Sequence, residues 1–145
     1  MFQPSFYDER MEGFPITIRL PVLWGDMDAF GHVNNARYFV WFEAVRLELF
    51  QRVQLASSGT PGVGPILAHV SCDFLKPVVW PAEIIVGTRV SSFGRTSFKM
   101  DYAIAHASQP DELVATGEGV IVLVNYGTGE KIPVSEELKA VIEAL

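Results

Sequence analysis

The chain gathers most of its candidate catalytic groups in residues 24–38. This stretch holds the carboxylates of Asp26 and Asp28, the imidazole of His32 and two adjacent asparagines, and the most apolar helical segment of the sequence follows it. A carboxylate can serve as a nucleophile or as a general base. The unpaired N–H groups and the positive dipole end of a helix N-terminus stabilise a developing oxyanion. The combination predicts attack on a carbonyl carbon at the start of this helix.

Asp28 is the candidate for the catalytic carboxylate. It lies six residues before Asn34, and a tight turn at Gly31 would direct it toward the helix start. Asp28 can either attack an electrophilic carbonyl carbon itself or deprotonate a water that attacks the carbon. The sequence leaves these two roles open. It also leaves open a structural role, which spacing alone favours, in which the aspartate only hydrogen-bonds its own turn.

Hydrophobic periodicity predicts the elements that position this loop. Residues 16–20 alternate apolar and polar side chains, which is typical of a half-buried strand. Residues 34–54 form a helix that is apolar on most of its circumference, which predicts burial all round, and Asn34 or Asn35 is a natural N-cap. Residues 56–65 are rich in Ser, Gly and Pro and are expected to be a loop.

Four further strands are predicted in the second half of the chain, at residues 66–76, 82–93, 95–107 and 112–125, and Ser135 is a candidate N-cap of a short C-terminal helix. A long buried helix must be covered by other parts of the chain. An antiparallel sheet curled around it would supply that cover and would bury one face of each strand. The pattern therefore predicts an α+β fold with a sheet of five or more strands.

Length and composition indicate one globular domain covering residues 1–145, with residues 1–14 as a loosely held arm. The chain is 49% hydrophobic and carries a formal net charge of −6, which argues against a nucleic-acid partner. The single cysteine, Cys72, is expected to be a buried small side chain rather than a nucleophile, and it fits a reducing compartment. No signal peptide and no membrane span is expected, so the chain is predicted to be cytoplasmic. The three histidines lack metal-ligand spacing, and no cofactor is implied.

Residues 24–46 resemble the active-site segment of the hotdog-fold acyl-CoA thioesterases, in the branch that contains 4-hydroxybenzoyl-CoA thioesterase. The matching residues are Trp24, Asp26, Asp28, Gly31, His32, Val33, Asn34, Asn35, Tyr38, Glu43 and Arg46. The resemblance implies a hotdog fold, an acyl-CoA substrate, Asp28 as the catalytic carboxylate and the backbone N–H of Asn35 as the donor to the thioester oxygen. It also implies a homodimer or homotetramer. Residues 32–38 are similar to relatives that act on medium- or long-chain fatty acyl-CoA.

The remaining candidate residues complete this predicted site. His32 is an auxiliary group that either orients a water or the acyl carbonyl, or ties the loop together by hydrogen bonds. Substrate contacts are predicted for Gly31, Asn34, Tyr38, Lys76 and Arg95. Of these, Lys76 and Arg95 are the candidates for the phosphates of CoA.

Two further carboxylates receive structural roles. Asp26 is expected to hold the loop through an ion pair with Arg37 or Arg46. Glu43 lies three residues before Arg46 on the predicted helix, a spacing at which the two side chains can pair.

Two other functions stay open at this point. One is a hotdog hydratase or dehydratase that acts on enoyl or hydroxyacyl thioesters, and the lack of a histidine in residues 34–54 counts against it. The other is a non-catalytic acyl-thioester binding protein, and the presence of Asp28 counts against that function.

Overall fold

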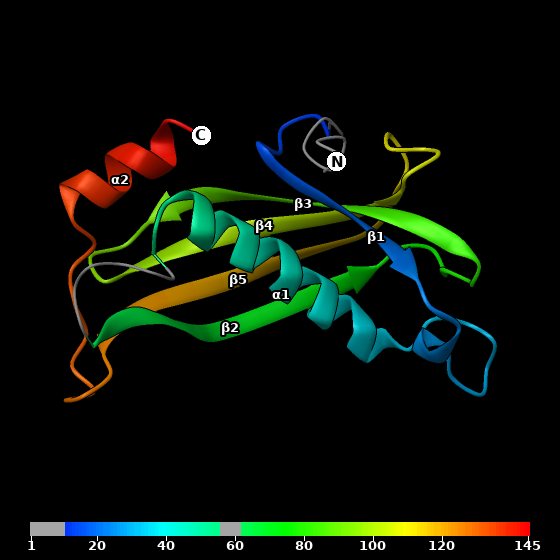
Figure 1. Ribbon diagram of the computed structural model, residues 1–145, viewed down its shortest axis with the longest axis horizontal. Helices are drawn as coiled ribbons and strands as arrows, with labels where there is room; N and C mark the ends of the chain where they lie inside the picture. Colours follow the sequence, from blue (N-terminus) through cyan, green and yellow to red (C-terminus); the bar gives the residue numbers. More distant parts are fainter. Residues whose placement is uncertain (1–10, 56–61) are drawn as a thin grey trace, which may run out of the picture.

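A single antiparallel sheet with one long helix across it makes up most of the structure (Figure 1). The computed structural model describes residues 11–55 and 62–145. Its elements in chain order are β1 (Ile16–Val22), the 3₁₀ helix η2 (Trp24–Asp26), α1 (Asn35–Arg52), β2 (Val63–Phe74), β3 (Ala82–Phe93), β4 (Ser97–His106), β5 (Leu113–Asn125) and α2 (Glu136–Glu143). The predicted α+β architecture is therefore confirmed.

The strand order is β1-β3-β4-β5-β2, and each neighbouring pair is antiparallel. β3 begins at the end of the sheet where β4 ends, since Ile84 pairs with His106. β2 ends beside the start of β5, with Phe74 opposite Ala115. These strand ends meet where α1 begins, whereas the β3–β4 turn lies at the opposite end (Figure 1). The topology thus decides which distant residues can reach the polar loop before α1.

The start of β2 differs from the prediction. Composition predicts a loop up to residue 65, yet residues 63–65 pair with the end of β5, with Pro65 opposite Leu123. β2 is an edge strand, and an edge tolerates proline because the missing N–H can face away from the neighbouring strand. Residues 56–61 of the predicted loop lie outside the described residues.

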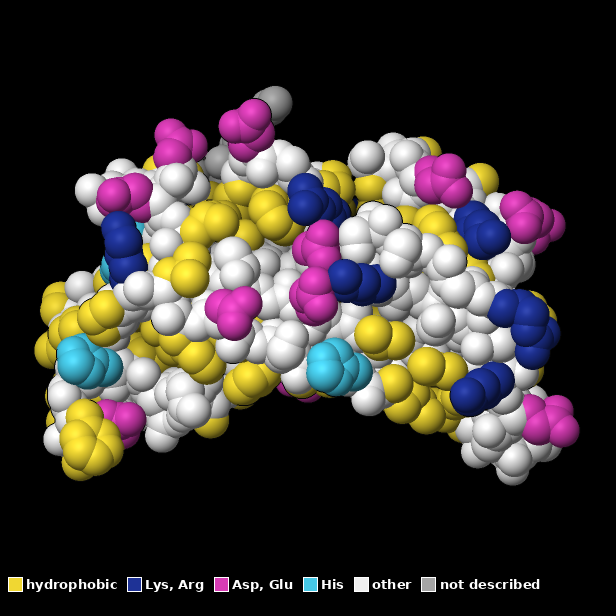
Figure 2. Space-filling view, turned by 180° about the vertical axis from the view of Figure 1, so that it is seen from behind, with side chains coloured by type: hydrophobic (Ala, Val, Ile, Leu, Met, Phe, Trp, Pro, Cys, Tyr) yellow, Lys and Arg dark blue, Asp and Glu magenta, His cyan; other side chains and the backbone are white. Residues whose placement is uncertain are grey.

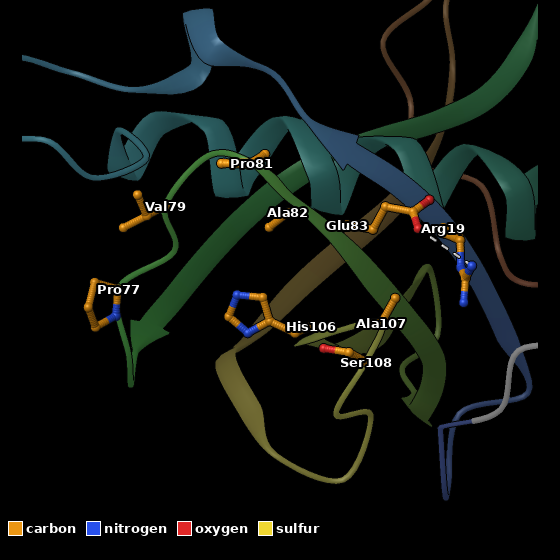
Figure 3. Close-up of a pocket in the computed structure, with 9 residues that line it drawn as sticks. All are labelled: Arg19, Pro77, Val79, Pro81, Ala82, Glu83, His106, Ala107 and Ser108. Atoms are coloured by element: carbon orange, nitrogen blue, oxygen red, sulfur yellow. Dashed lines mark ion pairs between the residues drawn. The ribbon is translucent and has the colours of Figure 1, made fainter.

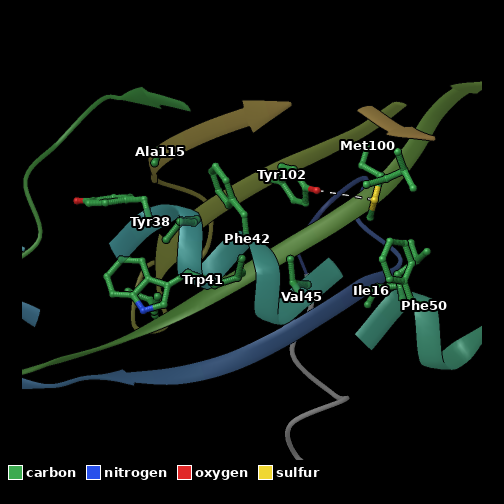
Figure 4. Close-up of a cluster of buried hydrophobic side chains, with 14 of the residues drawn as sticks. Ile16, Tyr38, Trp41, Phe42, Val45, Phe50, Met100, Tyr102 and Ala115 are labelled. Atoms are coloured by element: carbon green, nitrogen blue, oxygen red, sulfur yellow. Dashed lines mark hydrogen bonds between the residues drawn. The ribbon is translucent and has the colours of Figure 1, made fainter. Parts of the chain in front are cut away.

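Aromatic side chains fill the space between α1 and the sheet (Figure 4). Phe42 of α1 is fully buried and stacks on Tyr102 of β4, with ring centroids 4.5 Å apart and ring planes 12° apart. Gly117 of β5 permits this approach, because a Cβ at that position would lie 2.5 Å from the Phe42 ring. One turn further along α1, Arg46 donates a hydrogen bond of 3.1 Å to the Tyr102 hydroxyl.

The outer face of α1 is open, so the prediction of a helix buried on most faces is wrong for the single chain. Val40 and Leu47 are 44% and 48% exposed, and Glu43 between them is exposed. Ile66 and Leu67 of the neighbouring edge strand β2 are similarly exposed. The physical reason is that one sheet covers a helix from one side only.

The sheet face turned away from α1 carries acidic and basic side chains across its middle (Figure 2). Arg89 forms an ion pair of 3.1 Å with Asp101, and Lys99 forms one of 2.8 Å with Glu118. This face is therefore polar at its centre and contributes little to the core.

The described end of the N-terminal arm packs on the same face. Met11 is 5% exposed and lies against Ile85 and Ala103 of the sheet. The guanidinium of Arg89 lies 4.8 Å from the centroid of the Phe14 ring. Residues 11–14 are thus packed on the domain, and the rest of the predicted loose arm, residues 1–10, lies outside the described residues.

Candidate active site

Asp26 is the structural centre of the loop before α1. Its carboxylate is buried, accepts the Leu23 N–H at 2.8 Å and forms an ion pair of 2.9 Å with Arg37. Its carbonyl oxygen accepts the Asn34 N–H at 2.9 Å. The predicted loop-holding role is confirmed, with Arg37 rather than Arg46 as the partner. The Asp26 carboxylate links η2 to the start of α1, and both of its oxygens are used in these contacts.

Asp28 begins a tight turn that ends at His32. The Asp28 N–H donates to the His32 carbonyl at 3.0 Å, and the Gly31 N–H donates to the Asp28 carbonyl at 3.2 Å. Gly31 has a φ of +82°, in the left-handed region that favours glycine. Met27 and Val33 pair across the base of this turn. The segment is a miniature hairpin that presents the Asp28 side chain beside α1.

The two oxygens of the Asp28 carboxylate differ in their surroundings. Oδ1 accepts the Phe30 N–H at 2.9 Å, so the turn-stabilising interaction that spacing favoured does exist. Within residues 11–55 and 62–145, no donor is found for Oδ2. Half of the carboxylate therefore fixes its orientation, and the other half is available to a bound molecule.

The N-terminus of α1 leaves one particular N–H group unused. Asn34 is the N-cap, and its side-chain oxygen accepts the Ala36 N–H at 2.9 Å. Its carbonyl oxygen accepts the Arg37 N–H at 2.9 Å. The N–H of Asn35 has no acceptor in the described part of the chain. Asn35 is thus the donor that the helix start offers, which separates it from its neighbours Asn34 and Ala36.

A pocket of about 390 Å³ lies at this helix start. Its polar wall contains Asp28, His32 and Asn35, and the exposed Lys76 stands beside it. Its apolar wall consists of Phe30, Val33, Tyr38, Phe74, Leu75 and Pro77. Asp28 and Asn35, which carry the free carboxylate oxygen and the free helix N–H, consequently line one concave site with apolar surroundings, which is the usual form of a small-molecule site.

Comparison with known proteins identifies the family. The family model described as "Thioesterase-like superfamily" matches residues 22–142. The chain belongs to the Thioesterase-like superfamily. The matched span includes the loop with Asp28, the whole of α1 and all strands from β2 to β5.

Individual relatives agree with this membership. A thioesterase from Thermus thermophilus, solved with coenzyme A and Zn, is 32% identical with a TM-score of 0.78, over 92% of this chain and 96% of that one. The PA2801 protein from Pseudomonas aeruginosa is 31% identical with a TM-score of 0.80, and the match covers 88% of this chain and 97% of that one. A 1,4-dihydroxy-2-naphthoyl-CoA hydrolase from Synechococcus elongatus is 25% identical over 122 residues, 81% of this chain and 88% of that one. The predictions of a hotdog-fold thioesterase and of a thioester hydrolase are thereby confirmed.

His32 contributes to this thioesterase through two different groups. Its carbonyl oxygen ties the Asp28 turn, as described above, whereas its imidazole is exposed and lines the pocket. The loop is therefore held by the His32 backbone, and the ring is free to meet a ligand.

Tyr38 joins the pocket to the loop between β2 and β3. Tyr38 lines the pocket and is 3% exposed, and its hydroxyl lies near the backbone of Val78. Burial raises the pKa of Tyr38, with a smaller contribution from Cys72, and the Val78 backbone acts in the opposite direction. The carbonyl of Val78 in turn accepts the Val33 N–H at 2.8 Å.

The two predicted phosphate ligands are placed very differently. Lys76 reaches the pocket and forms a loose ion pair of 3.4 Å with Glu112, with both side chains more than half exposed. Arg95 lies in the β3–β4 turn, where its carbonyl accepts the Val134 N–H, at the end of the sheet away from Asp28. The single chain therefore does not bring Arg95 into this site, because a hairpin turn and the outer ends of its strands lie on opposite sides of a sheet.

The predicted pairing of Glu43 with Arg46 is wrong for the described residues. Glu43 is exposed, and the Arg46 guanidinium turns inward to Tyr102.

Cys72 is half-buried on β2. Burial, followed by the charge of Asp73, raises the pKa of its thiol to about 11. Such a thiol stays protonated and unreactive near neutral pH, as expected for a packed cysteine.

Sequence reasoning missed the part of the pocket that comes from the end of β2 and the loop after it. Phe74, Leu75 and Pro77 lie far from Asp28 in the chain and reach it through strand pairing. Their only signal was an apolar pair directly before a lysine and a proline at the end of a strand. Phe30 was also missed. The structure leaves this residue 85% exposed, which is unusual for a large apolar side chain.

A second hollow, of about 620 Å³, borders the loop after β2 (Figure 3). Pro77 borders both pockets, and the second one also contains His106 and the 3.6 Å ion pair between Arg19 and Glu83. It contains no helix N-terminus. The smaller pocket is therefore the candidate active site, because it alone of these two combines a free carboxylate oxygen with a free helix N–H.

Two further observations concern metal binding and membrane crossing. In residues 11–55 and 62–145, no group of three or more His, Cys, Asp or Glu side chains is placed to hold a metal ion. No helix in that same part of the chain has the length and apolar character needed to cross a bilayer.

Proposed function

We propose that this thioesterase hydrolyses an acyl-CoA to the free acid and CoA at the pocket beside α1. The observation that carries the proposal is that Asp28 and Asn35 line one pocket and that the Asp28 Oδ2 and the Asn35 N–H have no hydrogen-bond partner among residues 11–55 and 62–145. A thioester carbonyl whose oxygen accepts the Asn35 N–H would present its carbon to the Asp28 side of the pocket. The helix dipole adds to the stabilisation of the negative oxygen.

Two routes of attack are compatible with this arrangement. In the first, the Asp28 carboxylate attacks the carbonyl carbon, the C–S bond breaks with CoA thiolate leaving, and water hydrolyses the resulting mixed anhydride. In the second, Asp28 takes a proton from a water that attacks directly. The first route predicts that CoA appears before the free acid in a single turnover, and the second predicts that both appear together. His32 is proposed to orient the water or the acyl carbonyl.

The identity of the carrier is supported by the relatives. The Thermus thermophilus thioesterase was solved with coenzyme A, and the Synechococcus elongatus relative is named for an aromatic acyl-CoA. Lys76 is the cation at the pocket that we assign to a CoA phosphate. The single cysteine supports the reducing cytoplasm as the compartment of this reaction.

The test is release of free thiol from a panel of acyl-CoAs, with Asp28→Asn beside the wild type. We expect kcat to fall by roughly 10²-fold or more in the variant, the usual size of a lost base or nucleophile. Asp73→Asn is the matched control, because Asp73 is exposed on β2 and does not line this pocket. Thiol release that is equal in wild type and Asp28→Asn contradicts the proposal.

The same panel separates the alternative functions. A hydratase would remove the absorbance of an enoyl-CoA without releasing thiol. A non-catalytic binder would retain acyl-CoA and change neither signal.

We further infer that the chain acts as a homodimer or homotetramer assembled through β2. β2 is a 12-residue edge strand that, within residues 11–55 and 62–145, pairs only with β5. Apolar surface is exposed on and beside it by Ile66, Leu67, Val40 and Leu47. An edge of this kind pairs readily with a second copy. Light scattering should give two or four times the 16.1 kDa chain mass, and Leu67→Lys should lower that value. A wild-type mass of one chain would contradict this inference.

A further inference from the structure

The second hollow adjoins the candidate active site. Pro77 lines both the candidate active site and this hollow of about 620 Å³. Figure 3 shows Pro77 at one end of the hollow and the ion pair of Arg19 and Glu83 at the other, with His106 between them in this view. A long ligand that leaves the candidate active site past Pro77 can therefore continue into the second hollow.

Paired strands position the charged and polar side chains of this hollow. β1 supplies Arg19, β3 supplies Glu83, and β4 ends at His106. Arg19 is opposite Ile85 in the sheet, and His106 is opposite Ile84. The guanidinium, the carboxylate and the imidazole thus come from three neighbouring strands, whose backbone pairing fixes where these side chains begin.

The ion pair in this hollow is loose enough for an anion to replace it. The Arg19 Nη1 lies 3.6 Å from the Glu83 Oε1, which is longer than a hydrogen bond, and the Glu83 side chain is 53% exposed. A guanidinium can instead donate two N–H groups to two oxygens of one phosphate. The His106 imidazole and the exposed Ser108 hydroxyl line the same hollow and can also donate hydrogen bonds. These groups together suit a phosphate.

We propose that the second hollow is the subsite for the nucleotide end of CoA, with Arg19 as a ligand of its phosphates. This inference rests on the proposed function. Lys76, beside the candidate active site, is a single point charge, whereas CoA carries a diphosphate and a 3′-phosphate. The lining of the hollow follows the order of groups along CoA. The pantetheine arm passes the apolar surface of Pro77, Pro81 and Ala82, and the phosphates reach Arg19.

Assembly through β2 leaves this hollow accessible. Its lining residues in the described part of the chain come from β1, from β3, from the end of β4 and from the loop between β2 and β3, and none of them belongs to β2. β1 and β2 are the two opposite edges of the sheet. A nucleotide can therefore occupy the hollow while two copies pair through β2.

The kinetic test compares an acyl-CoA with the N-acetylcysteamine thioester of the same acyl group, which lacks the phosphates. Arg19→Gln should raise KM for the acyl-CoA by about tenfold, the usual size of a lost charge-assisted hydrogen bond, and should leave kcat unchanged. It should change neither constant for the N-acetylcysteamine thioester. Glu83→Gln should lower KM for the acyl-CoA by about two- to fivefold, because it removes the carboxylate that competes with the phosphate. A damaged fold cannot produce this gain.

Arg52→Gln is the matched control. Arg52 forms an ion pair of 2.9 Å with Glu48 near the C-terminal end of α1 and lines neither of the two pockets. This variant should keep the wild-type KM for both substrates. The inference is overturned if the wild type has equal kcat/KM for the two substrates, or if Arg19→Gln raises KM for both substrates alike or matches Arg52→Gln.

Titration calorimetry with CoA separates this inference from the proposed function, because binding requires no turnover. Arg19→Gln should weaken CoA binding by about tenfold, and Arg52→Gln should not change it. That result without thiol release from any acyl-CoA would contradict the proposed hydrolysis and still support the subsite. Equal Kd values for CoA in the wild type and Arg19→Gln, or no CoA binding by the wild type, would overturn the subsite.

Discussion

Val33 and Val78, far apart in the sequence, are joined by a hydrogen bond of 2.8 Å from the Val33 N–H to the Val78 carbonyl. Both side chains are buried, at 6% and 0% exposure. This hydrogen bond connects the Asp28 turn to the loop that follows β2. The relative positions of the free carboxylate oxygen and the apolar wall depend on this connection.

Replacing Val78 with alanine should weaken both the fold and the site. The lost methyl groups leave a cavity, which should lower the free energy of unfolding by about 1–3 kcal/mol. Turnover should fall as well, because the Asp28 turn loses a fixed support. Val79→Ala is the control, since Val79 is 44% exposed, and its effect should stay within about 0.5 kcal/mol. Urea unfolding and thiol release measure the two quantities. Equal stability of the two variants would contradict the role assigned to Val78.

Gly31→Ala should test the geometry of the Asp28 turn. A Cβ at Gly31 would meet nothing within 4 Å, so the expected cost comes only from the φ of +82°. That cost is about 1–2 kcal/mol for a residue with a Cβ. Because the turn orients Asp28, turnover should fall roughly tenfold or more. Gly25→Ala has equally open space and no positive φ, and it should leave stability and turnover unchanged. The idea fails if the two alanine variants behave alike.

Substitution of Asp26 should mainly lower the free energy of unfolding, whereas substitution of Asp28 should mainly lower turnover. Asp26→Asn removes the charge that faces Arg37 in a buried position and should lower the free energy of unfolding by about 1–3 kcal/mol. Asp28→Asn keeps an oxygen for the Phe30 N–H and should change the free energy of unfolding by less than about 0.5 kcal/mol while losing turnover. Chemical unfolding and thiol release on both variants give the comparison. An Asp28→Asn variant that is strongly destabilised would instead favour a purely structural aspartate.

Alkaline pH should destabilise the protein through groups that are buried in their neutral form. Burial raises the pKa of Cys72 from 9.0 to about 11, and it also raises the pKa of Tyr38 and Tyr102. A raised folded-state pKa of an acid means that its contribution to stability is complete below the unfolded-state pKa and disappears as pH rises through the folded-state pKa. The free energy of unfolding should therefore decline from about pH 9 to about pH 11. The decline should be shallower in Cys72→Ala, and an unchanged slope would refute the contribution of this thiol.

Much of the site could be predicted because its parts are close together in the chain. The turn from Asp28 to His32, the Asn34 N-cap and the free Asn35 N–H follow from hydrogen bonds between residues only a few positions apart. Such bonds depend on local backbone geometry and on side chains that the sequence displays directly. For the same reason, the pairing of Asp26 with Arg37 could be anticipated as one of two alternatives.

The partners that are distant in the sequence could not be predicted in this way. Arg46 has Glu43 within helical reach, yet it bonds to Tyr102, which β4 brings beneath α1. Arg95 carries a suitable charge for a phosphate, yet the β3–β4 hairpin places it at the opposite end of the sheet from Asp28. Local spacing gives no information about which strand ends meet, because that depends on the order β1-β3-β4-β5-β2.

The sequence by itself determined the α+β class, the polar turn before α1 and the family resemblance, since periodicity, caps and turn residues act over short stretches of chain. Only the tertiary structure decided what surrounds that turn: Phe74 and Pro77 as walls, Val78 as the support, and an open outer face on α1. The physical reason is that strand pairing between distant segments brings these groups together, and pairing is selected by the packing of the whole sheet rather than by any local pattern.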